Sequence, residues 1–295
     1  MSERTGRIVR SFSDVYEVQD GEEIVSCKLR GRFRKEGLSA LTGDWVRYED
    51  GPGPGGVITG ILPRRNQLVR PPVANVDQAV VVVTIKNPDL QLPLLDRLLL
   101  LVAHQDLDPL VCLNKLDLCR PSEVQDFLAL YGGAGYRTLA ISANGGIGLA
   151  ELAAELAGRV SVMAGQSGVG KSSILNALRP GLELRVGRVS QGSGRGRHTT
   201  RRVELLDVGN AALVADTPGF SRLDLDFLDK FELASYFPDM AGLQPDCRFP
   251  DCLHRHEPDC AVKAEVEAGR LAPSRYLNYL AFLEEIEEFE RRKYS

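Results

Sequence analysis

The segment GQSGVGKSS, residues 165–173, decides the fold of this chain. It fits the P-loop pattern, in which two glycines with four residues between them are followed by lysine and serine. The apolar segment RVSVMAG precedes it and the helix-like SSILNAL follows it. We therefore expect a strand, a phosphate-binding loop and a helix that begins near Gly170. An ordinary glycine-rich turn is the alternative, and the flanking segments disfavour it.

The residue types of this segment suit a bound triphosphate. Glycines let backbone N–H groups curl around the β-phosphate. Lys171 can bridge the β- and γ-phosphates, the Ser172 hydroxyl can bind Mg²⁺, and the helix N-terminus adds a partial positive charge. We predict that the whole loop contacts nucleotide, through Gly165, Gln166, Ser167, Gly168, Val169, Gly170, Lys171, Ser172 and Ser173.

Segments on both sides of the loop alternate between strand-like and helix-like patterns. DQAVVVVTI is a continuous apolar run of the kind found in buried parallel strands. A helix from about Leu94 to Ala103 follows, and PLVCL, SEVQDFLALY, YRTLAIS and GLAELAAEL then alternate between the two types. VELLDVGNAALVAD predicts a hairpin around Gly209 and Asn210. Residues 71–226 are therefore predicted to form a doubly wound α/β domain with a parallel sheet.

A second candidate nucleotide segment, NKLD at residues 114–117, ends a predicted strand. The Asp117 carboxylate can accept hydrogen bonds from guanine N1–H and N2–H₂, a pair of donors that adenine lacks. Asn114 can contact the other edge of the base, and the Lys115 stem can lie on the ring. Ser142 and Ala143 also follow a predicted strand and can back the base. A strand-end turn is the alternative for NKLD.

Two segments after the P-loop carry candidate contacts to Mg²⁺ and the γ-phosphate. In DTPGF, residues 216–220, Asp216 is placed to hold Mg²⁺ through water and the Gly219 N–H to meet the γ-phosphate. The basic, glycine-rich GSGRGRHTTRR, residues 192–202, offers Thr199 and Thr200. One of these threonines should reach Mg²⁺ together with Ser172, and the sequence does not choose between them.

The order of these segments is a rotation of the usual one. GTPases ordinarily run from the P-loop through the threonine loop and the DxxG segment to the base-reading and Ser-Ala segments. Here the base-reading and Ser-Ala segments come first. Joining the old ends of a domain and cutting it elsewhere preserves a site, because domain termini tend to lie close together. We therefore expect one GTP site in a circularly permuted domain.

The residue after the DxxG glycine, where many GTPases have a water-orienting glutamine, is Phe220. A phenyl ring cannot orient water, so another polar group is required or hydrolysis is slow. His198, beside the two threonines, is the best candidate, because an imidazole can orient water or accept its proton. The alternative is a loop histidine that contacts RNA or solvent.

Three of the six cysteines gather with a histidine in residues 247–260. Cys247, Cys252, His254 and Cys260 form a Cys₃His set, which suits one tetrahedral Zn²⁺ with no open position and hence a structural role. The surrounding RFPDCLHRHEPDC is short of apolar residues, and a metal can compensate for a thin core. His256 is the rival histidine, and free thiols or a disulfide are the alternatives to a metal.

Residues 1–70 contain short strand-like runs broken by turn residues and predict a small all-β barrel. In CKLRGRFRK every second residue is basic, and side chains alternate across a strand. A strand here would place Leu29 and Phe33 toward a core and four basic residues on the other face, where they could bind nucleic-acid phosphates. A solvated sheet face is the alternative for these basic residues, which are Lys28, Arg30, Arg32 and Arg34.

Residues 227–295 are predicted to be mostly helical. The last helix, SRYLNYLAFLEEIEEFERRKY, has apolar residues three apart and an acidic remainder. This pattern predicts one apolar stripe that packs on the core, with a partner-binding helix as the alternative. The stripe residues are Leu277, Leu280, Leu283, Ile286 and Phe289.

The composition of the 295 residues bounds these predictions. With 43% hydrophobic and 26% charged residues and a net charge of −4, the chain is globular and is no basic nucleic-acid coat. The N-terminus lacks the apolar core of a secretory signal, and no run approaches about 18 uninterrupted apolar residues. We expect a cytoplasmic monomer that binds no membrane and whose thiols stay reduced.

Together GQSGVGKSS, GRGRHTT, DTPGF, the permuted NKLD, CRFPDCLHRHEPDCAV and LTGDWV resemble the ribosome small-subunit-dependent GTPase A (RsgA) family, over essentially the whole chain. The resemblance implies an N-terminal OB-fold, a permuted P-loop GTPase domain and a C-terminal zinc domain. It also implies late maturation of the small (30S) ribosomal subunit, rRNA binding, and GTP hydrolysis that this subunit stimulates. The family's catalytic histidine falls on His198 and its zinc ligands on Cys247, Cys252, His254 and Cys260. The third threonine of the family's loop is replaced by Arg201.

Three other functions fit parts of the sequence. A signalling or transport GTPase could use the basic loops to bind a protein. A non-enzymatic RNA-binding protein could carry a vestigial P-loop, but the intact Lys171, Ser172 and Asp216 disfavour it. A P-loop ATPase or kinase is disfavoured by NKLD.

Overall fold

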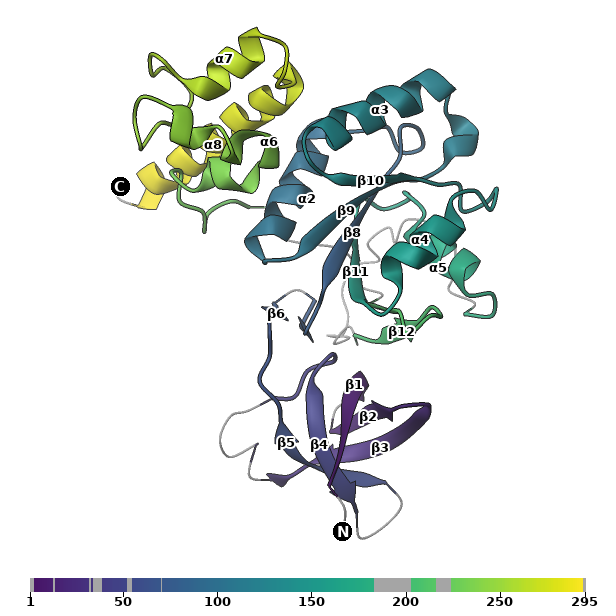
Figure 1. Ribbon diagram of the computed structural model, residues 1–295. Coiled ribbons are helices and arrows are strands. Elements are labelled where there is room, and N and C mark those ends of the chain that lie inside the picture. The colour runs from purple at the N-terminus through teal and green to yellow at the C-terminus, as the bar shows by residue number, and fades with distance from the viewer. Residues whose placement is uncertain are drawn as a thin grey trace, which may run out of the picture. The chain divides into compact units, whose positions relative to one another are not determined.

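The computed structural model describes residues 3–12, 14–31, 33, 39–51, 55–69, 71–182, 203–215 and 224–293. Two compact units each combine segments that are distant in the sequence. The first contains Met1–Val80 and Leu149–Ser221, and the second contains Val81–Gly148 and Arg222–Ser295. Figure 1 shows their helices and strands. Among the helices of the described ranges, none has the length and apolar character needed to cross a membrane.

The N-terminal segment of the first unit is a closed five-stranded barrel. Its strands are β1 (Arg4–Phe12), β2 (Val15–Asp20), β3 (Glu23–Leu29), β4 (Trp45–Asp50) and β5 (Gly56–Ile61). The order around the barrel is β1-β2-β3-β5-β4, with β3 and β5 parallel and the other neighbours antiparallel. Inward residues such as Ile8, Val18, Tyr48 and Ile58 are fully buried. The prediction of an OB-fold barrel is confirmed.

The predicted basic strand is shorter than expected. β3 ends at Leu29, and the backbone at Gly31 and Phe33 is helical. The Phe33 N–H donates to the Arg30 carbonyl at 3.1 Å, which turns the chain, and the phenyl ring is 7% exposed. The prediction that one strand face carries all the basic residues is therefore wrong, because the chain turns to bury this ring. Lys28 and Arg30 are exposed.

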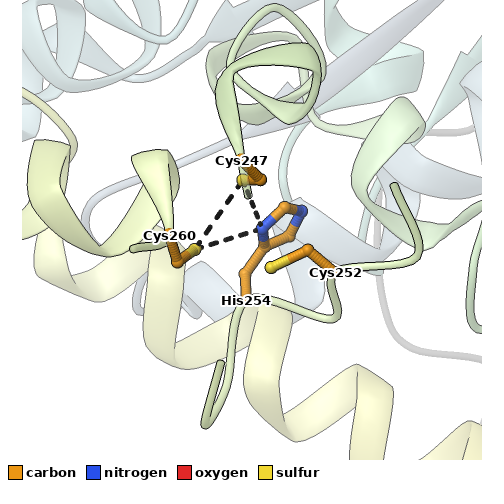
Figure 2. A group of neighbouring side chains, drawn as sticks. All are labelled: Cys247, Cys252, His254 and Cys260. Atoms are coloured by element: carbon orange, nitrogen blue, oxygen red, sulfur yellow. Dashed lines mark hydrogen bonds between the residues drawn. The ribbon is translucent and has the colours of Figure 1, made fainter. Parts of the chain in front are cut away.

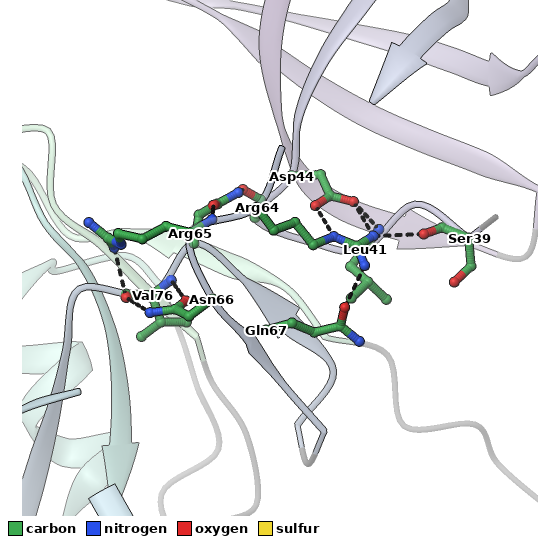
Figure 3. Close-up of polar contacts among 10 residues, drawn as sticks. Ser39, Leu41, Asp44, Arg64, Arg65, Asn66, Gln67 and Val76 are labelled. Carbon is green, nitrogen blue, oxygen red and sulfur yellow. Dashed lines mark hydrogen bonds and ion pairs between the residues drawn. The ribbon is translucent and has the colours of Figure 1, made fainter. Parts of the chain in front are cut away.

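A hydrogen-bonded segment connects the barrel to the sheet within the first unit (Figure 3). The fully buried Asp44 accepts two hydrogen bonds from Arg64, at 2.7 and 2.8 Å, and one from the Leu41 N–H at 2.7 Å. Asn66 exchanges hydrogen bonds with the Val76 backbone at 2.8 and 2.9 Å. Two short strands, β6 (Gln67–Leu68) and β7 (Val73–Ala74), pair between these contacts. The segment between the barrel and the sheet is therefore held by hydrogen bonds between paired polar groups.

The central sheet has six strands in the order β10-β9-β8-β11-β13-β12. These are β8 (Gln78–Val83), β9 (Asp108–Leu113), β10 (Arg137–Ala140), β11 (Val160–Ala164), β12 (Leu205–Asp207) and β13 (Leu213–Ala215). Every residue of β8 and β11 is buried, as their continuous apolar runs predicted. β9 and β10 are parallel, β11 and β13 are parallel, and β12 and β13 form the predicted hairpin.

Helices of the α/β fold lie where the sequence pattern placed them. In the second unit, α2 (Leu92–His104) packs on β9 and α3 (Pro121–Gly133) packs on β10. In the first unit, α4 (Leu149–Leu156) and α5 (Lys171–Leu178) contact each other. A single 3₁₀ turn, η1 (Leu116–Leu118), follows β9. The P-loop GTPase fold predicted for this region is confirmed.

The C-terminal part of the second unit is helical. It contains η2 (Leu233–Tyr236), α6 (Pro238–Ala241), η3 (Gln244–Asp246), α7 (Ala261–Glu267) and α8 (Pro273–Lys293). The predicted stripe on α8 is wrong at Leu277, which is 62% exposed. A helix has 3.6 residues per turn, so residues spaced strictly by three drift around it. The buried face instead follows Arg275, Asn278, Tyr279, Phe282, Leu283 and Ile286.

A buried ionic cluster fixes α8 to α2 inside the second unit. Arg275 and Asp96 are each 1% exposed, and the Arg275 Nη1 donates to Asp96 Oδ1 at 2.5 Å. Asn278 and Tyr131 donate to the same carboxylate at 2.6 and 3.0 Å. The Arg275 Nε and Nη2 donate to Asp239 at 3.0 and 2.9 Å. All the charges of this cluster are thus paired and hydrogen-bonded, as burial requires.

Candidate nucleotide and metal sites

The P-loop joins β11 to α5 in the first unit. Gly168 and Gly170 have φ angles of 87° and 99°, a left-handed conformation that glycine adopts at little cost. Val169 between them is 2% exposed and anchors the loop in the core. Gly170 is the N-cap of α5, so the loop ends where free backbone N–H groups favour an anion.

Lys171 already lies against this loop. Its Nζ donates to the carbonyls of Gly165 and Gln166, both at 2.8 Å. A phosphate that enters the loop would therefore meet a positive charge and backbone donors together, which is the requirement for charge-assisted binding. The strand, the glycine-rich loop and the helix follow one another in the order that the sequence predicted.

The NKLD segment follows β9 in the second unit and is held tightly. Asn114 is 1% exposed, and its N–H donates to the Val83 carbonyl at 2.8 Å. Lys115 has a φ of 65°, which is uncommon for a residue other than glycine, and its Nζ donates to the Asn87 carbonyl. Such conformations cost energy and concentrate at functional sites.

The Ser-Ala segment is bonded directly to NKLD. The buried Ser142 donates its Oγ–H to Asp117 Oδ1 at 2.5 Å and accepts the Gly145 N–H at 3.0 Å. The Ala143 N–H donates to Asn114 Oδ1 at 3.1 Å. Asp117 itself is exposed, so its carboxylate is oriented by Ser142 yet reachable from solvent. The two predicted base-contacting segments therefore form one structure.

Other predicted site residues lie outside the described ranges. They include the catalytic candidate, the magnesium-associated threonines, the DTPG contacts and two basic residues of the N-terminal region. These residues are His198, Thr199, Thr200, Asp216, Gly219, Arg32 and Arg34.

The predicted Cys₃His residues converge in the second unit (Figure 2). Their candidate ligand atoms all lie within 4.8 Å of one another. The His254 Nδ1 is 3.6 Å from the Cys247 Sγ and 3.4 Å from the Cys260 Sγ, and the two sulfurs are 3.9 Å apart. A tetrahedral Zn²⁺ with its usual bond lengths would have ligand separations of about 3.5–3.8 Å. The donor set and its spacing therefore fit zinc.

The surroundings of the cluster favour an ion over free thiols. His254 is fully buried and turns its Nδ1 toward the sulfurs, whereas His256 is exposed. Burial raises the pKa of Cys252 to about 12, so without a cation this thiol would stay protonated at neutral pH. A cation would offset the cost of the thiolate. The Cys247 and Cys260 sulfurs, 3.9 Å apart, are not joined in a disulfide.

Two family comparisons match most of the chain. Residues 61–226 match the family described as RsgA GTPase, and residues 5–58 match the family described as RsgA N-terminal domain. The chain belongs to the RsgA GTPase family. The family accounts for the P-loop, the base-reading segment and the barrel that precedes them, and RsgA proteins are GTPases, so the chain is an enzyme of the hydrolase class.

Curated RsgA relatives are similar over nearly their full length. The protein of Moorella thermoacetica named "Small ribosomal subunit biogenesis GTPase RsgA" is 48% identical, over 97% of this chain and 98% of its own length. The protein of the same name from Caldanaerobacter subterraneus subsp. tengcongensis is 43% identical, over 98% of each chain. The alignment therefore includes the C-terminal cysteine cluster as well as the family-matched ranges.

Two solved RsgA-like structures share the fold. YjeQ from Thermotoga maritima aligns with a TM-score of 0.85 and 39% identity, covering 97% of this chain and 99% of that one. YloQ, described as a circularly permuted GTPase, aligns with a TM-score of 0.83 and 37% identity, covering 97% and 96%. The permuted segment order in this chain agrees with that description.

Sequence reasoning missed the groups that support the RsgA sites. Tyr276 and Tyr279 of α8 donate their hydroxyls to the His254 and Leu253 carbonyls, at 2.6 and 3.1 Å. Gly145 and Ile147 close the loop that starts at Ser142. The sequence contains a local signal for the loop after Ser142, because the adjacent glycines Gly145 and Gly146 predict a turn. No local sequence signal identifies the two tyrosines, because the carbonyl groups that they contact are 22 and 26 residues away in the sequence.

Proposed function

We propose that this chain hydrolyses GTP to GDP and phosphate on the small ribosomal subunit during the late steps of its maturation. The observation that carries the proposal is the 48% identity, over nearly both full lengths, to a protein named for small ribosomal subunit biogenesis. The paired Asp117–Ser142 and Asn114–Ala143 contacts support guanine as the base. The P-loop conformation supports the phosphates.

One GTP site would be formed by five segments in permuted order. The base would lie on NKLD and the Ser-Ala loop, and the phosphates in the P-loop, each of which follows a strand of the same sheet. Mg²⁺ would be held by Ser172, by Thr199 or Thr200, and through water by Asp216. The Gly219 N–H would contact the γ-phosphate.

His198 is the proposed catalytic residue. Since Phe220 cannot orient water, the best candidate is a histidine that lies in the sequence beside the threonines proposed to bind Mg²⁺. Its imidazole would orient the attacking water or accept its proton. In this role His198 would act on the reacting water and would make no contact with the base.

Each of three domains would have a separate role. Residues 1–70 would form the RNA-binding OB-fold, residues 71–226 the permuted GTPase domain, and residues 227–295 the zinc domain. Lys28, Arg30, Arg32 and Arg34 would contact rRNA phosphates from the barrel. Zn²⁺ would be held by Cys247, Cys252, His254 and Cys260 and would act as a structural ion, since four protein ligands leave no position for substrate.

Nucleotide state would set the affinity for the subunit. The γ-phosphate orders the loops of a GTPase and hydrolysis releases them, so a ribosome-facing surface can change with each turnover. The chain would act as a monomer in the cytoplasm, where ribosomal subunits are assembled, and would bind no membrane.

The test is GTP turnover with and without purified small subunits. We expect the subunits to stimulate wild-type turnover. His198→Ala should lower the stimulated rate by about 100-fold, within the usual range for a general base, while GTP affinity stays near the wild-type value. No stimulation of the wild type would favour a signalling or transport GTPase, and wild-type turnover in His198→Ala would remove His198 from the mechanism.

A further inference from the structure

A cleft of about 500 Å³ lies within the first unit, between the barrel and the β12–β13 hairpin. The two walls are bonded to each other, because Thr42 Oγ1 donates to the Val203 carbonyl at 3.1 Å and Arg10 bridges to Glu204. The residues that line the cleft include none of the P-loop and neither Lys28 nor Arg30. The lining residues used below are Arg7, Asp20, Trp45, Asn210 and Ala211.

The single tryptophan of the chain lines this cleft. Trp45 is 41% exposed, although indole is among the largest apolar side chains. The guanidinium of Arg7 lies over its ring, 4.5 Å from the centroid. An exposed aromatic surface inside a concave site marks a place for a ligand, and a flat ring suits a flat one.

Arg7 has unused hydrogen-bonding capacity. It is half-buried, and its buried Nε has no hydrogen-bond partner among the described residues. Buried polar groups are nearly always paired, so an unpaired one requires an explanation. Because this guanidinium lies over the Trp45 ring at the wall of the cleft and Arg7 is only half-buried, its charge is suited to a phosphate oxygen that enters the cleft.

The hairpin wall is conformationally strained. Asn210 and Ala211 have φ angles of 52° and 54°, and the Ala212 N–H donates to the Gly209 carbonyl at 2.9 Å, as in a type I′ turn. Alanine is disfavoured in the left-handed conformation, and residues held in such conformations concentrate at ligand sites. The Gly158 N–H donates to the Asn210 carbonyl at 3.0 Å and fixes the turn.

Asp20 gives the cleft a fixed acceptor. Its Oδ2 accepts the Tyr48 hydroxyl at 2.8 Å, which orients the carboxylate. A carboxylate accepts hydrogen bonds from the exocyclic amino groups of adenine, cytosine and guanine, and uracil has no such group.

We propose that this cleft binds one unpaired nucleotide of a single-stranded RNA segment. The base stacks against Trp45, its amino group donates to Asp20, and the adjoining phosphate meets Arg7. The proposal rests on the proposed function, since a ribosomal subunit supplies such RNA. It assigns sequence preference to the cleft, whereas the basic residues after β3 would contact phosphates alone.

Trp45 emission reports on this site without labelling. Full-length protein saturated with GDP is titrated with oligoribonucleotides of about eight adenosines, cytidines or uridines, a length within the usual site size for single strands. We expect the adenosine and cytidine oligomers to quench the emission and to bind about tenfold more tightly than the uridine oligomer, as loss of one base contact implies. Arg7→Gln should weaken binding about tenfold, and Arg7→Lys should restore only part of it.

Arg47→Gln is the matched control, because Arg47 lies two residues from Trp45 on β4, forms an ion pair with Glu3 and does not line the cleft. Equal affinities in Arg7→Gln and Arg47→Gln, with both variants folded by thermal unfolding, would overturn the proposal. So would absence of quenching, or binding of adenosine monophosphate as tight as that of the oligomer, which would indicate a site for free nucleotides. Subunit-stimulated GTP turnover is measured in parallel. A chain that shows this stimulation but binds no RNA in the cleft would contradict the cleft proposal and leave the proposed function intact.

Discussion

At the scale of single residues, Asp117 combines exposure with a fixed orientation. Ser142 bonds one carboxylate oxygen and Gly145 bonds Ser142, so the carboxylate is held before any base arrives. A preorganised acceptor loses less entropy on binding, which strengthens discrimination between bases. The same contacts join two segments that are 25 residues apart in the sequence.

Replacing Asp117 by Asn should therefore change the base preference. The amide keeps one acceptor and gains a donor, so it should lose the pair of contacts to guanine N1–H and N2–H₂. Since hydrogen bonds to charged groups contribute about 1.5–3 kcal/mol each, GTP affinity should fall by roughly 100-fold. Xanthosine triphosphate, which has a carbonyl in place of the amino group, should bind the variant more tightly than the wild type.

Nucleotide titration measures both affinities, and Asp108→Asn is the matched control. Asp108 is at the start of the same strand and pairs with Arg137, away from the base-contacting segments. It should leave the nucleotide preference unchanged. Wild-type GTP affinity in Asp117→Asn would contradict the assignment of NKLD to the base.

At the scale of elements, the junction of α8 with α2 depends on the paired charges of Arg275, Asp96 and Asp239. Arg275→Leu would leave the buried Asp96 and the partly buried Asp239 without their counter-ion. Breaking a buried pair in this way costs about 3–5 kcal/mol, so the free energy of unfolding should fall by that amount in a denaturant titration. Burial already raises the pKa of Asp96, and loss of the guanidinium should raise it further.

This pKa shift gives the variant a pH dependence of known sign. A carboxyl whose folded-state pKa is raised binds protons more readily when folded, so it destabilises the fold as the pH rises. Arg275→Leu should thus be less destabilised in mildly acidic buffer than in neutral buffer. Arg270→Leu, which removes an exposed pair with Glu265, is the control and should show no resolvable change. Equal stability of the two variants would contradict the role of the buried cluster.

We expect the C-terminal elements to depend on a metal ion held by the cysteine cluster. The loop between η3 and α7 has few apolar side chains, and α8 contacts it through Tyr276 and Tyr279. Chelation should lower the thermal midpoint and added Zn²⁺ should restore it, because metal binding to such a site contributes directly to folding. Elemental analysis of freshly purified protein should find about one zinc per chain.

Cysteine variants separate the cluster from other thiols. Cys247→Ser should lose most of the bound zinc, whereas Cys119→Ser, which lies outside the cluster, should keep it. Zinc-free protein with an unchanged thermal midpoint would show that the cluster holds no structural ion.

Sequence patterns predicted most elements because their signals are local. Continuous apolar runs identified β8 and β11, and the glycine spacing identified the P-loop. The end of β3 and the face of α8 were missed because tertiary burial decided them: Phe33 turns inward, and α8 buries Arg275 and Asn278. Asp96 within the apolar LPLLDRLLLLVAHQD gave a usable signal, since a buried charge requires a partner, but the sequence does not identify that partner as Arg275.

At the scale of the whole molecule, the chain has a net charge of −4, yet its proposed partner contains RNA, which is also negatively charged. The acidic residues of α8 and the basic residues after β3 belong to different units, so the charge is distributed unevenly along the chain. Attraction to RNA then depends on local basic groups, and repulsion by the acidic helix restricts which surfaces can face the partner. Binding that depends on such groups should be strongly sensitive to salt.

Subunit affinity measured across a salt series tests this distribution of charge. Each neutralised phosphate releases counterions, so the logarithm of the affinity should fall linearly with the logarithm of salt concentration. Lys28→Gln and Arg30→Gln should each reduce the slope by about one if both contact phosphate. Lys293→Gln, an exposed cation at the end of α8, should leave the slope unchanged. An unchanged slope in the first two variants would remove them from the interface, and an affinity independent of salt would exclude phosphate contacts altogether.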